Sequence, residues 1–162
     1  MRLSIRVLSM ALALGGCAAA PVARSFDPKS AAPIAAVVTV PPGHDLVFVS
    51  GARAKNVAAP GPPPDYGTDT KIQALSVLKR LKATLAKEGL SFADVTTARV
   101  FLVGDPKLGG KMDFAGFNDA FRTEFGSAAQ PNRPTRAVVQ VVGLPAVRAL
   151  VEMDLIAARA HK

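Results

Sequence analysis

The chain has 162 residues, 49% of them hydrophobic, and a formal net charge of +8 at pH 7. This length is sufficient for one domain with a buried core. The positive charge favours anionic partners, whether small carboxylates, lipid headgroups or nucleic acid, without choosing among them. A single cysteine excludes an intramolecular disulfide.

The first 16 residues have the features of an export signal. Arg2 and Arg6 precede an apolar run that continues to Leu14, and the segment contains no acidic residue. The apolar run is too short for a lasting transmembrane helix. We therefore expect residues 1–16 to be a signal peptide, which directs the protein to the periplasm.

The residues at the end of this signal, Leu14-Gly15-Gly16-Cys17, resemble a bacterial lipobox. In such a motif the cysteine is lipidated and becomes the mature N-terminus. We expect Cys17 to anchor the protein to a membrane, and Ala18 after it favours the outer membrane. The alternative is an ordinary cleaved signal with an incidental cysteine. Residues 17–30 are rich in Ala, Pro and Ser, which predicts a tether, and residues 31–162 are expected to form the domain.

The domain opens with two predicted strands, at residues 37–40 and 46–50, joined by the turn signal Pro41-Pro42-Gly43. This order predicts a β-hairpin. Residues 52–67 then contain a cluster of prolines that can sustain neither a helix nor an interior strand, so we expect a long loop.

Two amphipathic helices and three further strands follow. The first helix is capped by Thr68 or Asp69 and ends at Gly89. Its expected buried face comprises Ile72, Leu75, Leu78, Leu81 and Leu85. Its lysines favour a solvated face over an RNA- or lipid-binding one. A strand is predicted at residues 95–103. The second helix begins at Asp113, and its expected core stripe is Phe114, Phe117, Phe121 and Phe125.

The final strands are predicted at residues 135–142 and 149–157, which completes a β-β-α-β-α-β-β order. This order indicates an α+β fold, a single sheet with both helices on one face. We expect one face of each final strand to be apolar and to meet the helices. The other face is expected to carry Arg136, Val138, Gln140, Leu150, Glu152 and Asp154. A face of mixed polarity suits a subunit interface with polar sites in it.

Several segments in register resemble the Rid (YjgF-type) reactive-intermediate deaminases. They are LVFVSG, EGLSFADVTTARVFL, DFAGFNDAF, PTRAVVQVVGLP and ALVEMDLIA, within residues 37–158. The resemblance implies a chorismate-mutase-like fold and a homotrimer whose sheets pack around a central barrel, with ligand clefts between subunits. It also implies hydrolysis of small 2-imino acids or enamines to 2-oxo acids and ammonia, without a cofactor.

The resemblance assigns roles to individual residues. Arg136 is expected to hold the substrate carboxylate, because a planar guanidinium can bind a carboxylate through two donors. Arg133 could compete for this role, since both residues lie near Pro134. Glu152 is expected to position or deprotonate water, or to form a salt bridge at the interface, perhaps with Arg136 itself. Ser50 and Gly51 are expected to hold ligand or water.

Asn118 matches the family's helix asparagine, which is expected to brace loop backbone at the binding site.

The sequence also departs from the family pattern. AAPIAAVVTV lacks the tyrosine that usually covers the ligand, and Tyr66 lies instead in the proline-rich loop. Val138 replaces a frequent cysteine, and Ala52 replaces the usual glutamine after Ser-Gly. These departures leave carboxylate capture intact but put the standard imine substrates in doubt.

Two functions remain open from sequence. The first is a deaminase, and the second is a non-catalytic periplasmic binding module for small carboxylates on the same trimer. A ribonuclease role, ascribed to some family members, is disfavoured by the export signal, so nucleic acid is not an expected partner. His44 and His161 are isolated, and no residue cluster has metal-ligand spacing, so no metal is expected.

Overall fold

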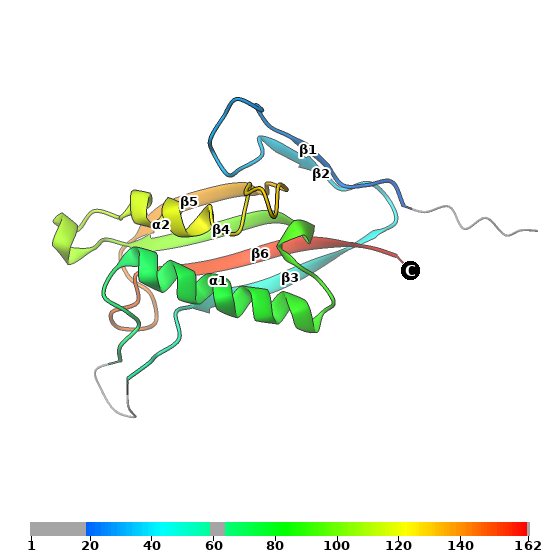
Figure 1. Ribbon diagram of the computed structural model, residues 1–162. Helices are drawn as coiled ribbons and strands as arrows, with labels where there is room; N and C mark the ends of the chain where they lie inside the picture. Colours follow the sequence, from blue (N-terminus) through cyan, green and yellow to red (C-terminus); the bar gives the residue numbers. More distant parts are fainter. Residues whose placement is uncertain (1–18, 59–63, 162) are drawn as a thin grey trace, which may run out of the picture.

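A four-stranded sheet is the centre of the fold (Figure 1). The computed structural model describes residues 19–58 and 64–161. The strands lie in the order β3-β6-β4-β5. They are β3 (His44–Arg53), β6 (Val151–Ala160), β4 (Val95–Val103) and β5 (Thr135–Val141). β4 and β5 are parallel, and the other two pairs are antiparallel. β3 and β5 are therefore the two edges of this sheet.

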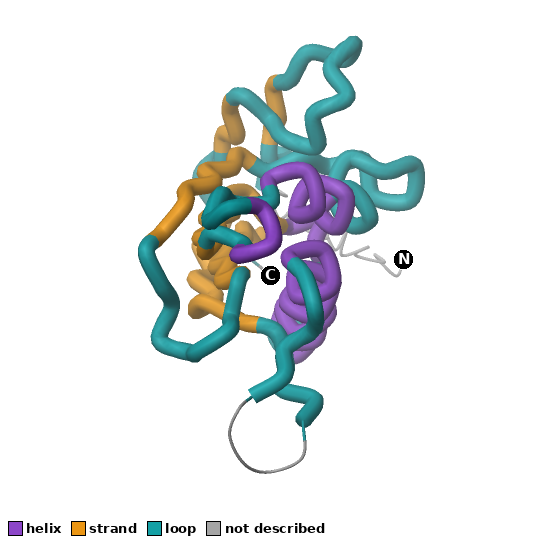
Figure 2. The backbone as a smooth tube through the Cα atoms, turned by 90° about the vertical axis from the view of Figure 1, so that its left-hand side faces the viewer, coloured by secondary structure: helices purple, strands orange, loops and turns teal. Residues whose placement is uncertain are grey.

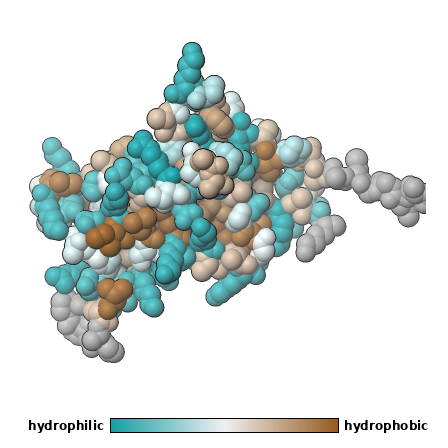
Figure 3. Space-filling model, in the orientation of Figure 1, coloured by the Kyte–Doolittle hydropathy of each residue, from teal (hydrophilic) through white to brown (hydrophobic). Residues whose placement is uncertain are grey.

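Both helices lie on one face of the sheet, which confirms the α+β arrangement. Figure 2 shows the strands as one layer and the helices α1 (Thr70–Lys87) and α2 (Phe114–Phe121) on one side of it. The core between the layers includes Val77, Leu81, Phe117 and Met153, none more than 1% exposed. Figure 3 views the helix side, where apolar patches lie among polar side chains. No helix of the described ranges covers the opposite face, which we call the open face.

Helix α1 begins and ends where the sequence predicts. The carboxylate of Asp69 accepts a hydrogen bond from the Ile72 amide at 2.9 Å, and Gly89 adopts the left-handed conformation just beyond the helix (φ 70°). The buried face differs from the expected one, because Ile72 and Leu75 are 46% and 41% exposed. Ala74 and Val77 are buried in their place, since small and β-branched side chains let α1 approach the sheet closely.

The phenylalanine stripe of α2 is confirmed for three of its four members. Phe117, Phe121 and Phe125 are fully buried, and the rings of Phe121 and Phe125 stack with centroids 4.4 Å apart. Phe114 is 43% exposed and lies at the open end of the stripe. Asp113 caps the helix by accepting from the Gly116 amide at 2.8 Å. The stripe thus fixes α2 over β4 and β5.

The predicted opening hairpin is wrong. β2 (Val37–Thr39) pairs with β1 (Ala23–Ser25) in a separate two-stranded sheet, while β3 pairs with β6. β1 falls within the segment expected to be a tether, and Arg24 fixes it to the domain by donating to the carbonyl oxygens of Ala93 (2.9 Å) and Val95 (3.0 Å). Ordered packing therefore begins before residue 31. The signal peptide and Cys17 lie outside the described residues.

The strand pairing also corrects which face of β5 meets the helices. Arg136 pairs in register with Ala98, and Val138 pairs with Val100, both of which are buried beneath the helices. Arg136, Val138 and Gln140 therefore face the helices rather than the open side. The sequence could not decide this, because both faces of β5 carry valines. In β6 the expectation is confirmed, since Val151, Met153 and Leu155 are buried.

Two short 3₁₀ helices, at Phe92–Asp94 and Pro106–Leu108, precede and follow β4. The first carries a capping box in which Ser91 and Asp94 satisfy each other's backbone amides. The second is capped by Asp105, whose carboxylate accepts from the Lys107 amide at 2.8 Å. These caps fix both ends of β4, the strand that sets the register of β5.

We expect Phe121→Ala to lower the free energy of unfolding by about 3–5 kcal/mol, because it empties the centre of a fully buried aromatic stack. Phe114→Ala is the matched control, and its cost should be about 1 kcal/mol or less because that ring is half-exposed. Urea-induced unfolding at a fixed protein concentration measures both. Equal losses would contradict the packing described here.

Candidate functional site

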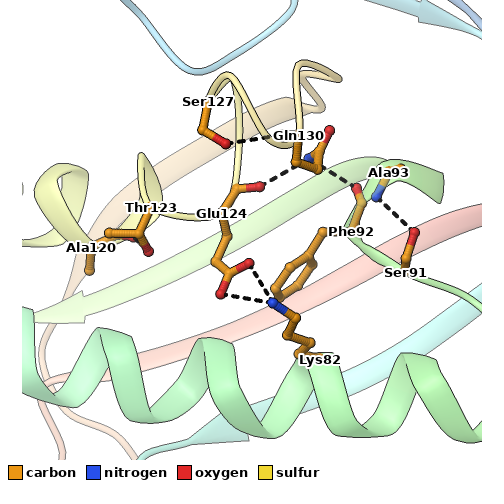
Figure 4. Close-up of polar contacts among 9 residues, drawn as sticks. All are labelled: Lys82, Ser91, Phe92, Ala93, Ala120, Thr123, Glu124, Ser127 and Gln130. Carbon is orange, nitrogen blue, oxygen red and sulfur yellow. Dashed lines mark hydrogen bonds and ion pairs between the residues drawn. The ribbon is translucent and has the colours of Figure 1, made fainter.

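The segment that leads into β5 is held by a network centred on Gln130 (Figure 4). The Gln130 amide nitrogen Nε2 donates to the carbonyl oxygens of Glu124 at 3.0 Å and Asn132 at 3.1 Å. The carboxylate of Glu124 in turn pairs with Lys82 of α1 at 3.0 Å. This network ties the end of α2 to α1 and to the start of β5. The strand therefore begins at a fixed place, with Arg136 as its second residue.

Arg136 lies against the aromatic rings of α2. Its guanidinium carbon is 4.6 Å from the ring centroid of Phe121, 5.5 Å from that of Phe117 and 5.7 Å from that of Phe114. Burial, together with repulsion from Arg122, lowers the pKa of Arg136 to about 10. The side chain is still cationic at neutral pH, but it has lost much of its hydration.

The guanidinium nitrogen Nη1 of Arg136 is buried and has no hydrogen-bond partner among the described residues. None of the carboxylates in that part of the chain forms an ion pair with it. A buried unpaired donor on a charged group is costly. The arrangement is thus poised to accept an anion supplied from outside the chain.

Asn118 lies on the same side of α2 as Phe114 and Phe121, one helical turn from each. Its side-chain oxygen is buried and has no hydrogen-bond partner in the described ranges. The expected bracing of loop backbone is therefore not seen. Asn118 and Arg136 thus each carry a buried polar atom without a partner among the described residues, one an acceptor and the other a donor.

Arg133, the alternative ligand residue, contacts the N-terminal segment, and its Nε is buried without a hydrogen-bond partner among the described residues. Its guanidinium carbon lies 4.3 Å from the ring centroid of Phe26, and Nη1 donates to the carbonyl oxygen of Ser30 at 3.1 Å. Both partners belong to the N-terminal segment around β1. Arg133 thus holds that segment in place.

Ser50 and Gly51 form a β-bulge in the edge strand β3. The register passes from Val49 opposite Leu155 to Ala52 opposite Met153, so these two residues face Asp154 alone. Both are exposed, and they line a groove of about 630 Å³ between β3 and α1. Their position leaves a hydroxyl and backbone groups available to a ligand.

Glu152 lies beside this bulge on the open face. A Cβ added at Gly51 would lie 2.5 Å from the carboxylate oxygen Oε1 of Glu152, so glycine permits this close approach. The other oxygen, Oε2, is 3.8 Å from Nε of Arg53, and the Glu152 side chain is 26% exposed. Sequence reasoning did not identify Arg53 as a neighbour of Glu152. Its position two residues after Gly51 in the same strand was the only signal for it.

A single chain does not bring Arg136 next to Ser50, Gly51 and Glu152. Arg136 belongs to the edge strand β5 and faces the helices, whereas Ser50, Gly51 and Glu152 lie at or beside the opposite edge. Strands β6 and β4 separate the two edges, a distance of roughly 14 Å at about 4.8 Å per strand. Glu152 itself lies in β6, two strand spacings or roughly 10 Å from β5, and on the opposite face of the sheet from Arg136, so these two side chains of one chain do not meet.

The described residues hold no cluster of metal-ligating side chains. His44 contacts the carbonyl oxygen of Pro41 at 3.1 Å, and His161 contacts the carboxylate of Asp45 at 2.9 Å. No helix in this part of the chain combines the length and apolarity needed to cross a bilayer.

Sequence comparison relates most of the chain to known proteins. The family model for Endoribonuclease L-PSP matches residues 25–159. Protein DfrA of Myxococcus xanthus is 35% identical over 130 residues, covering 80% of this chain and 88% of that protein. A RutC family protein of Haemophilus influenzae is 35% identical over 115 residues, covering 71% and 80% respectively.

Solved structures show the same fold. The Rid family protein YyfB from Yersinia pestis superposes with a TM-score of 0.64 at 19% identity, over 84% of this chain and 98% of that chain. TdcF from E. coli, solved with bound serine, has a TM-score of 0.55 at 31% identity, over 71% and 81% respectively. Because the family match spans most of the chain and its solved members share the fold, the protein belongs to the Ribonuc_L-PSP (YjgF/YER057c/UK114, Rid) family.

Proposed function

We propose that the protein hydrolyses small 2-imino acids or enamines in clefts between neighbouring copies of the chain. The observation that carries this proposal is the buried Nη1 of Arg136, a desolvated cationic donor without a partner among the described residues. A substrate carboxylate would satisfy it. The related protein TdcF was solved with serine, a ligand that has such a carboxylate.

Two copies are needed because the two edges of one sheet cannot reach one ligand. In an assembly, β5 of one copy meets β3 of the next, which places Arg136 beside the neighbour's Ser50, Gly51 and Glu152. The open face supports such an assembly. Its exposed apolar side chains include Leu46, Phe48 and Val139, which are 50%, 70% and 48% exposed.

The proposed reaction uses Arg136 to orient the substrate and Glu152 to activate water. The water oxygen attacks the imine carbon, and the C=N electron pair moves to nitrogen. The proton released by water passes through the Glu152 carboxylate to that nitrogen. The hydroxyl proton of the resulting carbinolamine then passes through the same carboxylate to the nitrogen, the C=O bond forms as the C–N bond breaks, and a 2-oxo acid and ammonia leave. The hydroxyl and backbone groups of Ser50 and Gly51 help to hold the water.

A binding module for small carboxylates is the second candidate. The contact between Glu152 and Arg53 favours it, because the carboxylate already has a charged partner in place of a water molecule. The absent tyrosine and the replacements at Ala52 and Val138 point the same way, since they alter the lining that orients a substrate in the family. Measured turnover of an imine substrate distinguishes a deaminase from a binding module.

We expect the protein to be a homotrimer that Val139→Asp dissociates, because the substitution would bury an unpaired charge between sheets. Light scattering measures the mass. Val142→Asp, at a fully exposed position beyond β5, is the matched control and should remain assembled. The expected target is Val139 rather than Val138, which faces the helices. A monomeric wild type would contradict the shared cleft.

Arg136→Ala should weaken binding of 2-oxobutanoate by about 30-fold or more, since a charge-assisted contact of this kind contributes on the order of 2–4 kcal/mol. Arg136→Lys should not restore affinity, because an ammonium lacks the planar pair of donors. Calorimetry gives the affinities, and ammonia release from freshly generated 2-iminopropanoate gives the rates. Unchanged binding and turnover in Arg136→Ala would rule out this site.

Glu152→Gln should abolish most turnover of 2-iminopropanoate while 2-oxobutanoate still binds. The amide keeps the shape of the side chain but cannot accept the proton. Ammonia release and calorimetry on the same preparations provide the two readouts. Turnover at the wild-type rate in Glu152→Gln would remove Glu152 from the mechanism, and a wild type that binds ligand without releasing ammonia would favour the binding module.

A further inference from the structure

A cavity of about 450 Å³ opens where β3 leaves the sheet, next to the proposed cleft. It is lined by Arg53, Ala54, Lys55, Asn56, Tyr66 and Arg80. Arg53 is two residues beyond Gly51, and its Nε lies 3.8 Å from the Glu152 carboxylate. A ligand that reaches Glu152 is therefore within side-chain reach of this cavity.

Cations predominate in the lining of the cavity. Lys55 and Arg80 form no ion pair with any described carboxylate, and Arg53 has only the long contact to Glu152. Three positive charges thus surround the space, and one negative charge lies at its edge. The three cations repel one another unless an anion binds between them.

The lining is held in place by hydrogen bonds. Nη1 of Arg80 donates to the carbonyl oxygen of Arg53 at 2.6 Å, which joins α1 to the end of β3. The Lys55 amide donates to the hydroxyl of Ser76 in α1 at 3.0 Å. Arg80 of α1 is thus held against the short stretch of backbone that carries Arg53 and Lys55.

The aromatic wall is also fixed. The side-chain oxygen of Asn56 accepts from the amides of Ala58 at 3.0 Å and Asp65 at 2.9 Å. The Asp65 carboxylate accepts from the Gly67 amide at 2.8 Å. These bonds hold the backbone on both sides of Tyr66, whose ring packs against the hydrophobic core. The cavity therefore has one apolar wall and a cationic rim.

We propose that this cavity is a second carboxylate subsite and that the protein acts on, or binds, 2-imino or 2-oxo dicarboxylates. The inference rests on the proposed function, because the first carboxylate must be held by Arg136 of the neighbouring copy. The reacting carbon then lies by Glu152, and the distal carboxylate lies between Arg53 and Arg80. Guanidinium groups suit this task because they bind carboxylates through paired donors.

Calorimetry on the assembled protein tests the proposal with 2-oxoglutarate and 2-oxobutanoate. We expect the dicarboxylate to bind at least about tenfold more tightly, the effect of one additional charge-assisted contact. Arg80→Gln should remove most of this preference and leave the affinity for 2-oxobutanoate unchanged. Lys79→Gln is the matched control, because it removes the same charge from the adjacent position of α1 outside the cavity.

Tyr66 supplies a second readout. It is the only tyrosine, and the chain has no tryptophan, so tyrosine fluorescence reports on the surroundings of Tyr66, which lines this cavity and a neighbouring one beside Asp105, and Arg80→Gln distinguishes the two. Succinate should change the emission, and acetate at the same ionic strength should not. The succinate response should be lost in Arg80→Gln and retained in Lys79→Gln.

The outcomes distinguish this inference from the proposed function. Equal affinity for the two oxo acids, or equal losses in Arg80→Gln and Lys79→Gln, would overturn the second subsite while Arg136-dependent binding of 2-oxobutanoate still stands. If neither acid binds, the proposed function and the subsite are both contradicted.

Discussion

The strand order β3-β6-β4-β5 is the constraint on which the chemistry depends. It places the Ser50-Gly51 bulge and Arg136 at opposite edges, so that under the proposed function each chain contributes two half-sites to different clefts. Arg136 is desolvated because it lies against the phenylalanine rings of α2. The phenylalanine rings of α2 offset part of the cost of its burial. An anion supplied at the assembled edge would offset the remainder.

The ends of a helix could be predicted from sequence where a capping residue sets them. Asp69 and Gly89 mark α1 because capping acts within a few residues. Pairing partners could not be predicted, since β2 meets β1 and β3 meets β6 through contacts distant in sequence. The face of the sheet on which Arg136 lies was predicted wrongly for the same reason, because it depends on how β5 pairs with β4. The proposed ligand role of Arg136 comes from the family pattern, and that pattern contains no signal for the phenylalanine rings that surround the guanidinium.

The residues that line the proposed site differ from the family pattern. The covering tyrosine and the glutamine after Ser-Gly are absent, while Arg53 and Arg80 add positive charge at the same edge. Tyr66 lies against the cavity from the proline-rich loop, not from the segment before the sheet. Selection of a ligand would accordingly depend less on an aromatic cover and more on the number of its negative charges.

Arg53 links this selection to the proposed base. In the free protein its nearest carboxylate is that of Glu152, at 3.8 Å, a separation too long for a strong paired hydrogen bond. A distal substrate carboxylate at Arg53 would compete for the same guanidinium and weaken its hold on Glu152. Binding of a dicarboxylate would thus release the base next to the imine carbon. A monocarboxylate leaves the contact in place, so Arg53 would make turnover of 2-imino dicarboxylates faster than that of 2-imino monocarboxylates.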